Sequence, residues 1–228
     1  MQHTEIDHLV VVAHTLAQGS SWCQTALGAS PVAGGKHPSM GTHNLLLLVA
    51  SAAYPKTYLE IIAIDPDAPP PGRSRWFNMD DPAQQARVRD AGPQLVGYVA
   101  RSAMVDMHRW GLINCRYQPG PILKASRETP KGTLQWQIVV PDDGRLLDCG
   151  AVPTLIQWQG AHPSDGLPAC GVSLTTVTVR GMPDQAAQVL RLRPLTRLPL
   201  PGPALTVQLQ RPDGQVIALS TATAWSAA

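Results

Sequence analysis

Apolar residues fall into short runs along this chain, separated by prolines and glycines, and no long helical stripe is present. The run at 6–13 is rich in β-branched residues and is bounded by polar ones, which predicts a strand. A short helix is expected over 22–27, ended by Gly28. After a predicted turn at Gly34-Gly35, apolar runs indicate two further strands, at 41–49 and 57–65.

The same order of elements begins again after a proline-rich break at 66–72. The polar stretch at 73–89 that follows is typical of a loop and a connecting helix. The predicted elements of this second half are a strand at 95–100, a helix at 103–110 closed by Gly111, and strands at 134–140 and 152–158. The sequence therefore contains an internal repeat in element order, with little residue identity between the halves.

A third, partial repeat of this order of elements is predicted in the last part of the sequence. It consists of a predicted strand at 172–179, a helix at 183–190, and a hairpin formed by 204–209 and 215–220. Because strands predominate and the helices are short, the pattern predicts an α+β fold with mostly antiparallel sheets.

Composition narrows the functional classes. With 228 residues, 44% of them hydrophobic and 15% charged, the chain can bury a sizeable core. Lys plus Arg number 18 and Asp plus Glu 16, a balance that argues against a nucleic-acid or acidic-membrane binder. The apolar runs are much shorter than the ~20 residues that span a bilayer, and the N-terminus does not resemble a signal peptide. We therefore expect a cytoplasmic protein that binds neither nucleic acid nor membrane.

Several common site motifs are missing from the sequence. The four cysteines, Cys23, Cys115, Cys149 and Cys170, form no C-x-x-C pair, so we expect free thiols and no zinc knuckle. No Gly-x-Ser-x-Gly elbow, Gly-x-Gly-x-x-Gly turn or P-loop occurs. Serine hydrolases and the usual nucleotide-driven enzymes are therefore unsupported.

Two polar residues interrupt otherwise apolar strand faces. Side chains alternate between the two faces of a strand. Glu60 is therefore expected on one face with Tyr58 and Ile62, and His8 on one face with Ile6 and Val10. A carboxylate on such a face is costly unless it is paired or bound to a cation. Glu60 is thus predicted either to contact a metal or substrate or to accept a buried hydrogen bond. His8 is a ligand or a satisfied core histidine.

The order and spacing of several short motifs resemble those of one superfamily. The tandem arrangement resembles the vicinal oxygen chelate superfamily, which includes glyoxalase and extradiol dioxygenase relatives, and more narrowly the bacterial glyoxalase-like domain proteins. The motifs are Ile6-Asp-His-Leu-Val, Gly41-Thr-His-Asn-Leu, Tyr58-Leu-Glu-Ile-Ile-Ala-Ile-Asp, Ser126-Arg, Lys131-Gly-Thr-Leu-Gln-Trp, Leu155-Ile-Gln-Trp and Ala161-His-Pro.

The resemblance implies a cup-shaped, mostly antiparallel sheet built from two βαβββ modules. These modules are expected at 4–66 and 95–160, joined by a linker and connecting helix at 67–94, with a partial βαββ module at 171–222. In the superfamily, the first and last strands of each module contribute ligands to a divalent metal at the centre of the cup.

Carried over to this chain, the resemblance implies metal ligands at His8, Glu60 and Gln157, with His43 as an alternative. Gly97 falls near the remaining ligand position and cannot bind a metal. A set of His, Glu and Gln donors suits Fe, Mn, Ni or Zn without selecting among them. The alternative for His43 is a position at a strand end.

Further candidates concern the substrate. Glu60 and the loop residue His162 are candidate catalytic acid–base groups, although plain solvent exposure is the alternative for His162. Arg127 matches a position that relatives often keep as Arg, where it could bind a carboxylate or phosphate. Its alternative is a surface ion pair with Glu128 or an Asp. Trp136 and Trp158 could wall the substrate pocket or pack in the core.

These features predict a metal-dependent lyase, isomerase or dioxygenase-type enzyme that acts on a small oxygenated metabolite, anionic if Arg127 lies at the mouth. The competing hypothesis is a metal-free protein of the same fold that binds or sequesters a small molecule, since fold alone does not fix function. A homodimer is compatible with either hypothesis.

Overall fold

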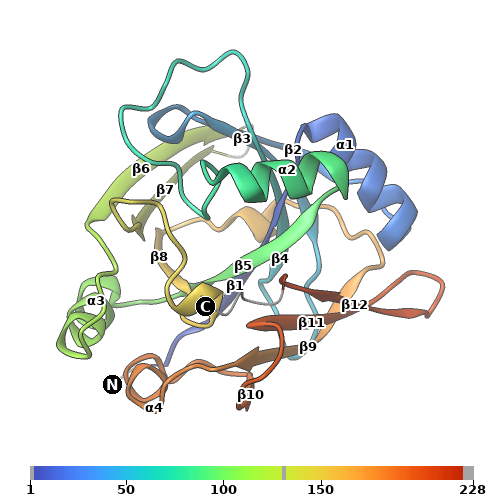
Figure 1. Cartoon of the computed structure of the whole chain (residues 1–228). Helices are drawn as coiled ribbons and strands as arrows, with labels where there is room; N and C mark the ends of the chain where they lie inside the picture. Colours follow the sequence, from blue (N-terminus) through green and yellow to red (C-terminus); the bar gives the residue numbers. More distant parts are fainter. Residues whose placement is uncertain (1–2, 130–131, 223–228) are drawn as a thin grey trace.

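The computed structural model describes residues 3–129 and 132–222, and its main feature is an eight-stranded sheet made of two copies of one arrangement (Figure 1). In each copy the first strand pairs in parallel with the last, and β1 pairs antiparallel with β5 to join the copies. The strand order is β2-β3-β4-β1-β5-β8-β7-β6. The strands are β1 (Glu5–Val12), β2 (Val32–His37), β3 (Thr42–Leu48), β4 (Tyr58–Ile64), β5 (Gln94–Arg101), β6 (Ile122–Thr129), β7 (Gly132–Val139) and β8 (Thr154–Gln159). The predicted α+β fold with tandem βαβββ modules is confirmed.

The sheet curls until its two outermost strands approach each other. Gly35 of β2 and Arg127 of β6 lie at opposite edges, yet a Cβ atom on Gly35 would lie 2.4 Å from Arg127 Cδ. A side chain at position 35 would therefore require the Arg127 side chain to move from where it crosses β2. The prediction of a turn at Gly34-Gly35 is wrong, because here glycine permits close approach within a strand. The pattern did not predict β2 or β6.

The helices follow the repeat but differ from their predicted bounds. Helix α1 (Leu16–Trp22) continues as a π-helical turn (Cys23–Leu27) and ends at left-handed Gly28, so only its predicted end is confirmed. Its N-cap is Thr15, whose hydroxyl accepts from the backbone N–H of Gln18. Gly111 does not close the second-module helix, α3 (Val105–Asn114), but lies inside it against Val189.

A second, four-stranded sheet packs against the convex face of the large one, below it in Figure 1. Its strands and helix share one apolar core with α1, α3 and the odd-numbered residues of β1, such as Leu9 and Val11. The elements are β9 (Ser173–Arg180), α4 (Asp184–Leu190), β10 (Thr196–Leu198), β11 (Leu205–Gln210) and β12 (Val216–Ser220), in the order β10-β9-β11-β12. Strand β10 was not predicted.

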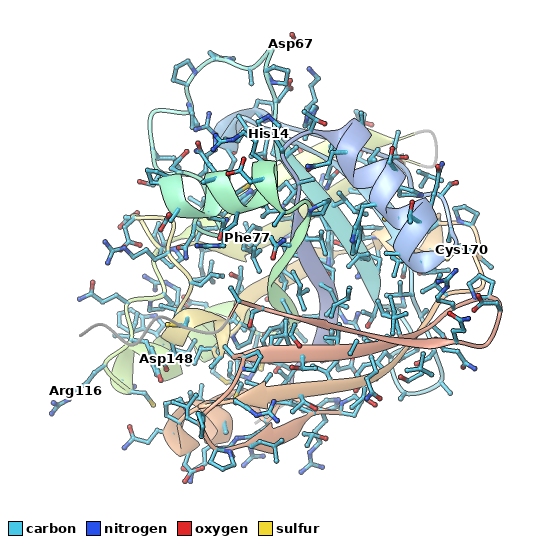
Figure 2. All side chains as sticks on the ribbon, turned by 45° about the vertical axis from the view of Figure 1, so that its right-hand side comes forward. His14, Asp67, Phe77, Arg116, Asp148 and Cys170 are labelled. Carbon is cyan, nitrogen blue, oxygen red and sulfur yellow. The ribbon has the colours of Figure 1, made fainter. Side chains whose placement is uncertain are left out.

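The concave face carries a separate apolar cluster that includes Val10, Ile62, Val99 and Ile156. The segment between the modules contributes Trp76 and Phe77 to this cluster and then forms α2 (Pro82–Asp90). Figure 2 shows Phe77 in the interior, whereas Asp67 and Arg116 lie at the outline of the molecule. Short 3₁₀ turns occur at Pro38–Met40, Asp148–Gly150 and Pro163–Asp165. Within the described residues, no helix is long and apolar enough to cross a membrane.

Candidate functional site

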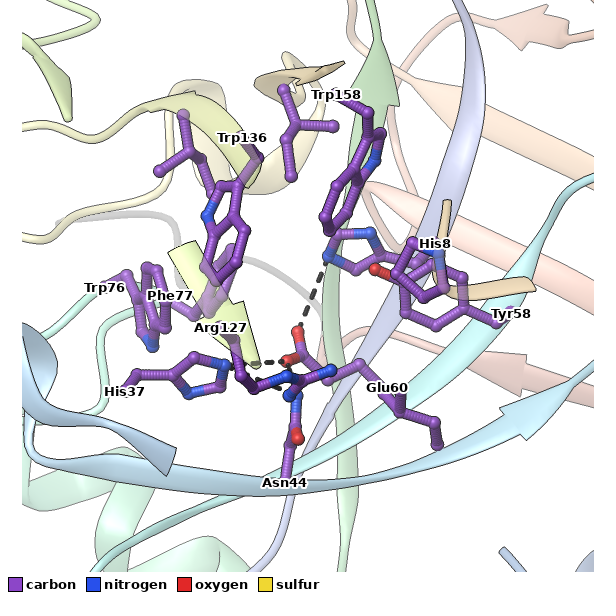
Figure 3. A pocket seen from close by; sticks show the side chains of 14 residues that line it. His8, His37, Asn44, Tyr58, Glu60, Trp76, Phe77, Arg127, Trp136 and Trp158 are labelled. Atoms are coloured by element: carbon purple, nitrogen blue, oxygen red, sulfur yellow. Dashed lines mark hydrogen bonds and ion pairs between the residues drawn. The ribbon is translucent and has the colours of Figure 1, made fainter. Parts of the chain in front are cut away.

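A pocket opens on the concave face, between the two modules (Figure 3). Both modules and the segment that connects them contribute side chains to its lining. They include His8, His37, Asn44, Tyr58 and Glu60 from the first module, Trp76 and Phe77 from the connecting segment, and Arg127, Trp136 and Trp158 from the second module. The pocket therefore brings His8 and Glu60 of the first module near side chains of the second module.

Glu60 is buried in the pocket with three nitrogen-bearing neighbours. Asn44 Nδ2 donates to Oε1 at 2.5 Å, His8 Nε2 lies 3.5 Å from Oε2, and His37 Nε2 lies 4.0 Å from Oε1. Burial alone raises the pKa of Glu60, but the hydrogen bond and positive charge of His8, helped by His37 and Asn44, lower it to about 2. Glu60 is therefore a carboxylate at neutral pH.

His8 lies between two carboxylates. Its Nδ1 is 2.7 Å from Asp7 Oδ1, its Nε2 faces Glu60, and its ring stacks on Tyr58 at 4.7 Å between centroids. Burial lowers the pKa of His8, but hydrogen bonds and charge from Asp7 and Glu60 raise it to about 9. His8 is therefore an imidazolium at neutral pH. By contrast, burial lowers the pKa of His37 to about 4, which leaves that ring neutral.

Asp7 is a fully buried residue that the sequence analysis did not select. Besides His8, it accepts at Oδ2 from Trp158 Nε1 (3.0 Å) and from His162 Nε2 (3.0 Å). Burial raises the pKa of Asp7, but His162 and His8 lower it far below its usual range. Strict alternation of side chains would put Ile6 and His8 on the same face of β1. The pairing of β1 with β5 shifts register between these two residues, so Ile6 lies in the core on the convex face instead. The available signal was an acidic residue inside an apolar strand.

His162 is buried rather than exposed, so the solvent-exposed alternative is wrong. The Ser164 backbone N–H donates to its Nδ1 at 3.2 Å, which makes Nδ1 an acceptor and leaves Nε2–H to donate to Asp7. His162 does not line the central pocket, but contacts Asp7 from the opposite side to His8. A direct acid–base role for His162 stays a prediction that this placement does not favour.

Two predicted metal ligands lie away from the pocket. Gln157 Oε1 accepts from the backbone N–H of Val105 in α3 at 2.9 Å, and the neighbouring Trp158 lines the pocket instead. His43 also has its side chain elsewhere, with Nδ1 3.9 Å from Asp65 Oδ1. The predicted grouping of both with His8 and Glu60 is therefore not found. Within residues 3–129 and 132–222, no three His, Cys, Asp or Glu side chains form a metal-binding group.

Arg127, Trp136 and Trp158 line the pocket. Their contact with a substrate stays a prediction. Arg127 forms no ion pair with any described residue, and its buried Nε has no hydrogen-bond partner. Its expected surface partner, Glu128, accepts from Thr133 Oγ1 instead. Arg127 is thus a cation within the pocket lining that makes no ion pair of 4.0 Å or less with any described residue.

Five polar or aromatic lining residues were missed by the sequence analysis. Asn44 was overlooked because it looked like an ordinary strand residue. In the alternation of β3, however, its side chain lies on the face that lines the pocket. Trp76 and Phe77 lie in a polar stretch without periodicity, so only their aromatic character could have signalled them. The missed residues are His37, Asn44, Tyr58, Trp76 and Phe77.

Comparison with known families decides the classification of the chain. A profile described as "Glyoxalase-like domain" matches residues 6–195, which is most of the chain. The chain belongs to the glyoxalase-like domain family. The predicted resemblance to the vicinal oxygen chelate superfamily is confirmed with it.

Solved structures of low sequence identity are similar to this glyoxalase-like protein. A hypothetical protein from Staphylococcus aureus is 13% identical, with a TM-score of 0.58 over 95% of this chain and 86% of that one. A Streptomyces coelicolor methylmalonyl-CoA epimerase in complex with 2-nitronate-propionyl-CoA is 14% identical, with a TM-score of 0.40 over 70% of this chain and 100% of that one. No curated protein matches the chain.

The stability of the glyoxalase-like protein is expected to depend on pH through this buried cluster. The pKa of His8 is raised from 6.5 to about 9, so its contribution is complete below pH 6.5 and is lost as pH rises through 9. The pKa of Glu60 is lowered from 4.5 to about 2, so its contribution is present above pH 4.5 and is lost as pH falls through 2. The pKa of His37 is lowered from 6.5 to about 4, so stability also falls as pH drops below 6.5. Urea unfolding should therefore give its largest free energy near pH 6.5.

The alkaline loss due to His8 should be on the order of 3 kcal/mol. The variant His8→Gln should be less stable than the parent at pH 6 and should lose less stability between pH 6 and pH 10. A parent protein whose free energy of unfolding is unchanged between pH 6 and pH 10 contradicts this assignment.

Proposed function

We propose that this glyoxalase-like protein is an isomerase- or lyase-type enzyme that moves a proton on a small oxygenated metabolite. The observation that carries the proposal is the buried ion pair of His8 and Glu60 at the pocket, where a carboxylate and an imidazolium lie 3.5 Å apart. Such a pair offers a base for a C–H bond and an acid for an adjacent carbonyl oxygen.

The proposed step is removal of a proton from a carbon next to a carbonyl group. Glu60 takes the proton, the C–H electrons form a C=C bond, and the carbonyl π electrons move to oxygen. The imidazolium of His8 donates a hydrogen bond to that oxygen and stabilises the enolate charge. Return of the proton to the same carbon or to a neighbouring one completes an epimerisation or isomerisation.

Substrate binding would also adjust the basicity of Glu60. In the free protein, His8 contributes to holding the pKa of Glu60 at about 2, which makes Glu60 a weak base. A substrate oxygen that takes over the His8 Nε2–H removes this partner from Glu60. The pKa of Glu60 then rises toward a value that is more useful for proton transfer.

The described pocket residues do not form a complete metal site. His8 and Glu60 supply two donors, whereas catalytic zinc sites use three protein ligands, and Gln157 and His43 lie elsewhere. The metal-dependent form of the hypothesis, with Fe, Mn, Ni or Zn, thus lacks a third ligand from the described residues. Elemental analysis of protein purified without a chelator is expected to show substoichiometric transition metal.

The proposal is tested by hydrogen–deuterium exchange at carbon. The protein is incubated in D₂O with a panel of 2-oxo and 2-hydroxy carboxylates, and loss of the C–H signal next to the carbonyl or carboxylate is followed by proton NMR. We expect exchange with at least one substrate, unaffected by EDTA. Exchange that is abolished by EDTA and restored by a divalent metal contradicts the metal-free step.

The second candidate function is a small-molecule binding protein without catalysis. It is favoured by the second module, which presents Ile138, Ile156 and two tryptophans to the pocket where the first presents His8 and Glu60. Under this alternative, no panel compound undergoes exchange. Glu60→Gln then changes ligand affinity by only about 0.5–1.5 kcal/mol, the net contribution of one hydrogen bond.

A further inference from the structure

Positive charge is concentrated in one segment of the second sheet. Between residues 180 and 210 the sequence contains four arginines, one aspartate, and no lysine or glutamate, which gives a net charge of +3. The whole chain carries only +2, so the rest of it is slightly negative, at −1. Such an asymmetry in a nearly neutral chain indicates a surface that meets an anion.

Three of these arginines line one groove. Arg191, Arg193 and Arg197 lie along an open groove of about 650 Å³ that is formed by α4, β10 and the segment that joins them. This volume is typical of a small-molecule site. The groove shares no lining residue with the pocket of His8 and Glu60, and its elements lie at the bottom of Figure 1. It is therefore a separate cavity.

The backbone holds two of the arginines in place. Helix α4 ends at Arg191, which has a left-handed φ of 48° and whose N–H donates to the Ala187 carbonyl. The Arg193 N–H donates to the Thr4 carbonyl at 3.1 Å, and the Thr4 N–H donates in return to the Leu190 carbonyl at 3.1 Å. The segment is thus hydrogen-bonded to the chain at the start of β1, so these side chains project from an anchored backbone.

One carboxylate lies beside the three guanidinium groups. Arg197 Nη2 donates to Asp184 Oδ1 at 2.6 Å and to the Met182 carbonyl at 2.9 Å. The Asp184 side chain is 84% exposed, so water weakens this ion pair. Arg193 forms no ion pair of 4.0 Å or less with any described residue. Three arginines and one aspartate leave a charge of about +2, which matches a dianion.

The floor of the groove is apolar. Met182 and Leu192 are buried members of the core, and the half-buried Leu195 packs against that core. Inorganic phosphate would leave this surface exposed to water, whereas an organic group attached to the phosphate would cover it. A phosphate monoester also fits the charge better than a carboxylate, because it carries close to two negative charges above its second pKa of about 6.

We infer that this groove binds a small organic phosphate monoester. The phosphate would pair with Arg193 and Arg197, with Arg191 beside them, and the organic part would lie over Leu192 and Leu195. The inference goes beyond the proposed function, because it concerns a second site whose ligand takes no part in the proton transfer at Glu60.

Three probes test the two requirements by isothermal titration calorimetry at about pH 8 and low salt. Phenyl phosphate is a dianion with an apolar ring, benzoate has a similar ring and one negative charge, and inorganic phosphate has no apolar part. We expect phenyl phosphate to bind about tenfold more tightly than either of the others, and less tightly at high salt. Equal affinities for phenyl phosphate and benzoate, or no binding of phenyl phosphate at millimolar concentration, overturn the inference.

A fourth probe distinguishes a soluble ester from a lipid headgroup, which offers the same phosphate chemistry. Vesicles of neutral phospholipid with phosphatidic acid are mixed with the protein and collected by centrifugation. We expect the protein to stay in the supernatant. Binding to these vesicles without binding to phenyl phosphate overturns the inference of a soluble ligand.

Variants assign the binding to the groove. Arg193→Gln should weaken phenyl phosphate binding about tenfold, and Arg193→Glu should abolish it. Arg87→Gln is the matched control, because Arg87 is exposed on α2, in the upper part of Figure 1. An equal loss in Arg87→Gln and Arg193→Gln overturns the assignment. Glu60→Gln should leave phenyl phosphate affinity unchanged, so this site and the proposed enzyme can fail independently.

Discussion

Replacing Glu60 by Gln is expected to lower the rate of exchange at carbon by roughly 10²–10⁴-fold, the usual contribution of a general base. Gln keeps the size of Glu and can still accept the hydrogen bond from Asn44, but it has no carboxylate to take a proton. The exchange rate of a responsive panel compound should be compared in parent and variant by proton NMR. Ligand affinity measured by calorimetry should change much less than the rate.

Thermal unfolding separates a catalytic role of Glu60 from a structural one. The variant also removes one of the two carboxylates that neutralise His8, and removing a partner from a buried ion pair can cost about 3–5 kcal/mol. Because Asp7 still pairs with His8, we expect a smaller loss and a folded protein. Glu128→Gln, an exposed change on β6, is the matched control and should alter neither property. Exchange at the parent rate in folded Glu60→Gln eliminates Glu60 as the base.

Asp7→Asn is expected to be the most destabilising of the conservative changes in this cluster. Asp7 is completely buried, accepts from His8, His162 and Trp158, and lies 3.8 Å from Arg101 Nη1. An asparagine presents an N–H₂ group to some of these donors and removes the charge that holds His8 as an imidazolium. The expected loss is about 3–5 kcal/mol in the free energy of unfolding, as for other broken buried pairs.

Urea unfolding at pH 6 measures this loss, and Asp142→Asn supplies the control. Asp142 has a side chain that is 86% exposed and lies 3.9 Å from Arg73, so its substitution should change stability by less than about 0.5 kcal/mol. If Asp7→Asn proves as stable as Asp142→Asn, then Asp7 is not the buried anion on which His8 depends.

The tandem fold could be predicted because its buried strands carry continuous apolar runs. Strands β1, β3, β4 and β5 lie inside the sheet, and their sequences identified them. The edge strands β2 and β6 could not be identified, because an edge strand buries less surface and needs fewer apolar residues. Gly34 and Gly35, which look like a turn, lie in β2 because Asn44 and Arg127 approach its backbone too closely for a side chain.

The site could be predicted only in part. His8 and Glu60 stand out because a polar residue on an apolar strand face needs a partner, and they were found to be each other's partners. Gln157 was chosen because it matches a ligand position of the superfamily. On β8, however, its side chain lies on the opposite face to that of Trp158, which lines the pocket. Asp7 was missed because a register shift in β1 cannot be read from alternation alone.

The most direct test of the central claim is an NMR titration of the His8 ring in the ¹⁵N-labelled parent protein, assigned by comparison with His8→Gln. The claim is that His8 is an imidazolium held between the carboxylates of Asp7 and Glu60. It predicts that both ring nitrogens remain protonated through neutral pH and that the ring deprotonates near pH 9. A His8 ring that is already neutral at pH 7 would contradict both the buried ion pair and the proton-transfer chemistry proposed from it.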